Sequence, residues 1–139
     1  MTESAATDQF TTKSGNKTAD SGTLINTITE ALLEKKAKEI VLLDVRELTT
    51  LTDFFIVCHG TSDTQIGALA SSVSQKTKKE LGEAEWKKEG LEGRRWIILD
   101  YVNVVVHIFS QDKRDYYGIE RMWNDAEITK IEDPEIENS

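Results

Sequence analysis

The chain has few of the residues that form covalent or metal cross-links. Its 139 residues include one cysteine, Cys58, one proline and two histidines, His59 and His107. A single cysteine excludes an internal disulfide and a CxxC redox or metal site. The histidines lie inside strand patterns without a His-x-x-x-His pair, so we expect no metal site and no cofactor. We interpret His107 as a packed or hydrogen-bonded strand residue and Cys58 as a small buried hydrophobe.

Long apolar runs and an excess of positive charge are also missing. No apolar run approaches the roughly 18 residues of a bilayer span, and the N-terminus has neither the basic nor the apolar region of a secretory signal. We therefore expect a cytoplasmic protein with no membrane partner. Carboxylates outnumber Lys and Arg by 25 to 17, giving a net charge of −8. This balance argues against direct nucleic-acid binding and favours a basic protein partner.

The sequence contains no strong catalytic pattern. A metal-dependent transferase needs carboxylates that converge on one Mg²⁺, and the usual Asp-x-Asp spacing on one strand is absent. Asp44 and Asp100 lie near the ends of predicted strands, and Ser62 begins a predicted helix. We expect no enzyme and no catalytic residue. An active nucleotidyl or phosphoryl transferase that uses these three residues is kept as an alternative.

The composition that is present predicts one folded domain with two loose ends. A hydrophobic content of 38% over 139 residues suffices for a single core. Residues 1–22 hold too little apolar surface to offset chain entropy and are predicted to form a disordered N-terminal extension. Residues 23–126 are predicted to form the domain, and residues 127–139 an acidic C-terminal tail.

Hydrophobic periodicity predicts an α/β fold with a mixed sheet flanked by helices. Apolar residues at helical spacing from Leu24 predict a first helix, which Ser21 or Thr23 caps. Ser62 and Gln65 match a capping box that begins a second helix, and Gly82 ends it. The strands are expected over residues 39–45, 54–59, 96–99 and 104–109, with an irregular edge strand and loop in 86–95 and a last helix over 112–125. The sequence leaves the strand order open.

The segment from Arg94 to Trp123 has more aromatic residues than two short strands need for packing. Trp, Tyr and Arg are enriched at binding hot spots. Packing in the core is an equally good interpretation for some of them, and for Trp123 in particular. We expect Tyr101 in the hairpin turn and Tyr117 to be exposed. The set comprises Trp96, Tyr101, Tyr116, Tyr117 and Trp123, interleaved with Arg114 and Arg121.

Several motifs together resemble the ribosomal silencing factor family, also called RsfS, Iojap or YbeB-like. They are Leu-Asp-Val at 43–45, TDFFIVCHGTS at 52–62 with Gln65, Gly90 with Gly93, WIILDY and VVVHIF within 96–109, and RDYYGIERMW at 114–123 with Asp125-Ala126. The resemblance covers about residues 24–126. It implies a nucleotidyltransferase-like fold without the catalytic carboxylates.

The resemblance also implies a binding role. Members dock on a large-subunit ribosomal protein, the L-fourteen protein, at the face where the subunits join, and so block the small subunit and repress translation. They are commonly homodimers when free. By position, Trp96, Tyr101 and Tyr117 match contact residues, and Glu120 and Trp123 belong to the same terminal motif. A homodimeric adaptor with no ribosomal role is the other alternative.

This chain departs from the family pattern at two positions. Val102-Asn103 stands where the family usually has Gly-Asp in the hairpin, and Gly118 replaces the usual Asp near the last helix. Because a β-branched residue is costly at positive φ, we expect a hairpin turn of a different type or of greater length.

Overall fold

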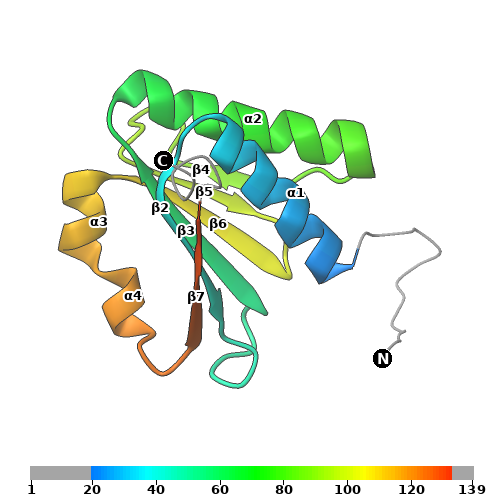
Figure 1. Ribbon diagram of the computed structural model, residues 1–139, viewed down its shortest axis with the longest axis vertical. Helices are drawn as coiled ribbons and strands as arrows, with labels where there is room; N and C mark the ends of the chain where they lie inside the picture. Colours follow the sequence, from blue (N-terminus) through cyan, green and yellow to red (C-terminus); the bar gives the residue numbers. More distant parts are fainter. Residues whose placement is uncertain (1–19, 133–139) are drawn as a thin grey trace.

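The computed structural model describes residues 20–132, which form a six-stranded sheet with four helices (Figure 1). Residues 1–19 and 133–139, where most of the two expected loose ends fall, lie outside the described residues. The elements follow in the order α1 (Ser21–Glu34), β2 (Lys38–Asp44), β3 (Phe54–Gly60), α2 (Asp63–Leu81), β4 (Lys87–Glu89), β5 (Trp96–Asp100), β6 (Val104–Ser110), α3 (Gln111–Tyr117), α4 (Ile119–Met122) and β7 (Glu127–Ile131).

The sheet is mixed, as the sequence predicts, and its strand order is β4-β5-β6-β3-β2-β7. Strands β3 and β6 at its centre are parallel, and α2 lies in the long connection between them. Every other neighbouring pair is antiparallel, including the predicted hairpin of β5 and β6. The expected edge strand before β5 is the short β4.

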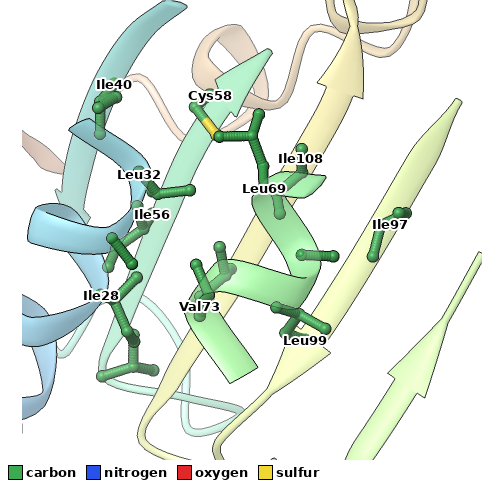
Figure 2. Close-up of a cluster of buried hydrophobic side chains, with 14 of the residues drawn as sticks. Ile28, Leu32, Ile40, Ile56, Cys58, Leu69, Val73, Ile97, Leu99 and Ile108 are labelled. Carbon is green, nitrogen blue, oxygen red and sulfur yellow. The ribbon is translucent and has the colours of Figure 1, made fainter. Parts of the chain in front are cut away.

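Helices α1 and α2 cover one face of the sheet, which we call the helix-covered face (Figure 1). Figure 2 shows Leu32 from α1 and Leu69 from α2 directed at β-strand side chains such as Ile56. All three are fully buried. Since burial of each such side chain contributes about 1.5–3 kcal/mol, this face contains the main core.

Both ends of α2 follow the local sequence signals. Ser62 Oγ accepts a hydrogen bond from Gln65 N at 3.0 Å, while the Gln65 side chain accepts from Thr61 N at 2.7 Å. Gly82 ends α2 in the left-handed conformation, as predicted. The predicted cap of α1 is wrong by one residue, because Asp20 accepts from Thr23 N at 2.8 Å.

The C-terminal segment differs from prediction in two ways. A continuous helix over residues 112–125 is wrong, since Gly118 has φ +58° and separates α3 from α4. Glycine adopts this conformation without a Cβ penalty, so the chain turns there. We also expected the domain to end at residue 126, but β7 adds an edge strand that pairs with β2 from Glu127 to Ile131.

Candidate functional site

The second face of the sheet, which we call the open face, carries aromatic side chains. Helices α3 and α4 lie on this side (Figure 1), where Ile119 joins the apolar residues of β2 and β3. Side chains alternate along a strand, so paired residues in neighbouring strands share a face. The register pairs Trp96 with Phe109 and Ile98 with His107. Thus Trp96, Ile98, His107 and Phe109 all lie on the open face.

Seven rings form one connected group. We call six of them the aromatic cluster: Phe55, Trp96, His107, Phe109, Tyr117 and Trp123. The seventh, the exposed Tyr116, contacts only Tyr117 among them, at 5.0 Å. Trp96 is at its centre, with its ring centroid 4.9 Å from Phe109 and 4.5 Å from Tyr117. At the other end, Phe55 contacts His107 at 5.1 Å and Trp123 at 5.5 Å. Segments that are distant in sequence therefore meet on one surface.

Exposure divides this cluster into a buried base and an accessible upper layer. Phe109 is fully buried and His107 is 6% exposed. By contrast, Trp96 and Trp123 are half-buried, and Tyr117 is 41% exposed. The predicted exposure of Tyr117 is therefore confirmed. Rings supported from below by buried rings form a rigid platform that a partner can cover with little loss of side-chain entropy.

A hydrogen bond fixes the centre of the cluster. Trp96 Nε1 donates to His107 Nδ1 at 3.0 Å. Burial disfavours the charged imidazolium and lowers the pKa of His107 from 6.5 to about 4. His107 is therefore neutral near pH 7, and the interpretation of it as a hydrogen-bonded strand residue is confirmed.

Tyr101 lies on the opposite side of the sheet, so its predicted exposure is wrong. It is 8% exposed and belongs to the core of the helix-covered face. Its hydroxyl lies 2.9 Å from Thr77 Oγ1 of α2, and burial raises its pKa above the ordinary value. The reason is strand alternation, which places Tyr101 on the same side as Ile97 and Leu99.

The hairpin turn before β6 is tight despite its valine. Val102 has φ +76°, and Asn103 N donates to Tyr101 O at 2.9 Å, the geometry of a γ-turn. Val102 therefore adopts the positive φ that is costly for a β-branched residue, and the expected turn of a different type or of greater length stays a prediction. Asp100 Oδ1 accepts from Val102 N at 2.8 Å, and Thr52 Oγ1 donates to Val102 O at 2.9 Å. These bonds offset the backbone strain.

Glu120 forms an ion pair that joins the two short helices. The buried Arg114 guanidinium contacts Glu120 Oε2 at 2.7 Å and also reaches Lys38 O and His59 Nδ1 at 3.3 and 3.0 Å. Burial and the adjacent Arg114 charge lower the pKa of His59. The sequence grouped Arg114 with the aromatic residues of a candidate binding surface and gave no sign that it connects α3 to β2 and β3.

The residues of the transferase alternative do not converge. Ser62 follows the C-terminal end of β3. Asp44 ends β2, which is antiparallel to β3, so these two residues lie at opposite ends of the strands. Asp100 lies at the same end as Asp44, but two strands separate β5 from β2, a spacing of about 14 Å at the usual strand separation. Asp44 is paired with Arg46 at 2.6 Å, and this hydrogen bond lowers its pKa.

The other chemically reactive candidate is inaccessible. Cys58 is fully buried in the main core (Figure 2), and burial raises the pKa of its thiol to about 12. Its interpretation as a small buried hydrophobe is confirmed. Among residues 20–132, no three His, Cys, Asp or Glu side chains are grouped closely enough to hold a metal ion. Within the same range, no helix is long and apolar enough to cross a membrane.

Comparisons with known proteins agree on one family. The family model described as "Ribosomal silencing factor during starvation" matches residues 18–139. A ribosomal silencing factor RsfS from Halalkalibacterium halodurans is 37% identical over 109 residues, covering 78% of this chain and 92% of the relative. One from Chromobacterium violaceum is 44% identical over 94 residues, covering 68% and 76%.

More distant relatives and solved structures extend the likeness. The chloroplastic protein Iojap of Zea mays is 34% identical over 110 residues, which are 77% of this chain and 45% of the maize protein. A crystal structure of a Chromobacterium violaceum protein has a TM-score of 0.74 at 38% identity and covers 76% of this chain and 88% of its own. The resemblance drawn from the motifs is thus confirmed, and the chain belongs to the ribosomal silencing factor (RsfS) family.

Proposed function

We propose that this protein binds the large ribosomal subunit in the cytoplasm through its open face and sterically blocks the small subunit. The proposed partner is the L-fourteen protein at the intersubunit face. The single observation that carries the proposal is the aromatic cluster, in which half-exposed Trp96 and Tyr117 stand on fully buried Phe109. Aromatic anchors on a rigid base are typical of binding hot spots.

The contact surface is proposed to continue from the cluster onto α4. Trp123 is half-buried beside Phe55, and Glu120 keeps part of its carboxylate exposed while Arg114 fixes its position. An oriented carboxylate at the rim suits a basic partner, as does the net charge of −8. Tyr101 is not part of this surface, because the sheet separates it from the open face; we propose that it supports the hairpin instead.

Steric blocking requires no reaction. A protein that occupies a joining face needs only volume and enough affinity to remain bound, and a few desolvated aromatic side chains supply most of the affinity at ordinary interfaces. The same accessible apolar side chains are proposed to pair two copies when the protein is free. Light scattering of the purified chain over a range of concentrations tests that dimer.

A subunit-joining experiment tests the proposal. Purified large subunits are incubated with the protein, small subunits are added, and joined ribosomes are separated on a sucrose gradient. We expect the wild type to reduce the joined peak, and Tyr117→Ala to need about thirtyfold more protein, which corresponds to about 2 kcal/mol of binding free energy. Trp86→Ala is the control, because Trp86 is 65% exposed and lies outside the aromatic cluster. Unchanged joining at saturating wild-type protein would exclude the blocking mechanism.

A further inference from the structure

His107 has an unusual position for a polar side chain. It is 6% exposed and lies on β6, one of the two central strands, with ring contacts to Phe55, Trp96 and Phe109. One of its nitrogens, Nδ1, accepts the hydrogen bond from Trp96 Nε1. The other, Nε2, is buried and has no hydrogen-bond partner within residues 20–132.

The protonation state of the ring follows from these contacts. Because Nδ1 accepts a hydrogen bond, the neutral imidazole carries its proton on Nε2. That N–H is removed from water without an acceptor, which reduces the stability of the fold. An apolar side chain of similar size would avoid this loss. The hydrogen bond that Nδ1 accepts from Trp96 is therefore the contribution that compensates for burying a histidine here.

The hydrogen bond determines the orientation of the Trp96 indole, which ring stacking alone does not. Trp96 stacks on Phe109 with an interplanar angle of 26°. Rotating the indole by 180° about its Cβ–Cγ bond would keep the ring in the same plane but would direct Nε1 away from His107. The plane of the ring is therefore compatible with two orientations, and the bond to Nδ1 selects one of them. The chosen orientation determines which indole edge a partner contacts.

We infer that His107 is a positioning residue, which holds Trp96 in the single orientation that docks on the partner. The inference rests on the proposed binding role of Trp96. It differs from that proposal in assigning a function to a side chain that the partner does not need to touch. It also predicts that binding is sensitive to the acceptor at this position.

The test compares His107→Leu, which has no acceptor, with His107→Asn, whose amide oxygen can take the place of Nδ1. We expect His107→Leu to bind purified large subunits five- to tenfold more weakly, which is the scale of one lost hydrogen bond. His107→Asn should bind within about twofold of the wild type. The thermal midpoint of His107→Leu should equal or exceed that of the wild type, since the buried unpaired N–H is removed.

A spectroscopic measurement separates this inference from the proposed function. The indole N–H resonance of Trp96, assigned by its loss in Trp96→Phe, should be protected from solvent exchange in the wild type and in His107→Asn but not in His107→Leu. This result is expected even if Trp96→Ala were to bind as the wild type, an outcome that would defeat the docking proposal alone. Equal exchange in all three proteins would overturn the positioning role.

A double-mutant comparison completes the test. If His107 acts through Trp96, then adding His107→Leu to Trp96→Phe should not weaken binding further, because phenylalanine has no N–H to orient. Independent, additive losses would contradict the inference. So would equal losses of binding in His107→Leu and His107→Asn, or wild-type binding by His107→Leu.

Discussion

The two faces of the sheet are built from different residues. The helix-covered face is closed by α1 and α2 and consists almost entirely of aliphatic side chains that are fully buried, such as Ile28, Leu69 and Ile108. The open face carries the aromatic cluster, which includes half-buried Trp96 and His107, and also the second histidine of the chain, His59. One face stabilises the fold, and we propose that the other presents its rings to a partner.

The comparison shows why an aromatic residue cannot be assigned to binding by type alone. Tyr101 and Trp96 are five positions apart on one hairpin, yet they lie on opposite faces. Tyr101 uses its hydroxyl inside the core, whereas Trp96 uses its N–H to fix its orientation at the surface. Position relative to the sheet decides the role.

Removing a side chain from the helix-covered face should have the largest effect on stability. Leu69→Ala deletes a fully buried side chain of α2, so the free energy of unfolding should fall by about 3 kcal/mol. Urea denaturation measures this loss. Affinity for large subunits, corrected for the folded fraction, should not change. A lower corrected affinity would contradict the claim that the helix-covered face stabilises the fold without taking part in binding. Gln75→Ala, at an exposed position of the same helix, is the matched control.

Lowering the pH should reduce the free energy of unfolding, because His107 on the open face becomes protonated more readily in the unfolded chain. The pKa of His107 is about 4 in the folded chain and 6.5 as its ordinary value, so the unfolded chain binds more protons between these limits. Stability is therefore complete above about pH 6.5 and falls as the pH approaches 4. Between pH 7 and 5 we expect a loss of about 2 kcal/mol in urea denaturation. The same loss in His107→Leu would show that another group causes it.

A smaller effect should distinguish Tyr101 from the binding residues. Tyr101→Phe removes only the hydroxyl that contacts Thr77, so unfolding should become easier by about 1 kcal/mol. Binding to large subunits should remain at the wild-type level. Weaker binding by this variant in the gradient assay, without loss of folded protein, would show that Tyr101 belongs to the contact surface.

Local sequence signals predicted both ends of α2 and the hairpin pairing of β5 with β6. Ser62, Gln65 and Gly82 act through bonds within a few residues, so their roles are legible in the chain. Alternation along the strand from Trp96 also predicts that Tyr101 lies on the same face as Leu99. The opposite prediction, that Tyr101 is exposed, follows from its place beside a turn, and it is wrong.

Other features depend on contacts between distant segments. Arg114 is buried because Lys38 O and His59 lie beside it, 76 and 55 residues away in the chain. Strand β7 lacks an apolar pattern and exists because it pairs with the edge of β2. The bond between Trp96 and His107 requires the register of β5 on β6. None of these contacts follows from spacing along the sequence alone.

The central claim is that the open face binds the large ribosomal subunit, and a matched pair of tryptophan variants tests it most directly. Trp96→Ala and Trp86→Ala each remove one indole, from the aromatic cluster and from the segment before β4. Sedimentation with purified large subunits should give about thirtyfold weaker binding for Trp96→Ala and wild-type binding for Trp86→Ala. Wild-type binding by a folded Trp96→Ala protein would contradict the account.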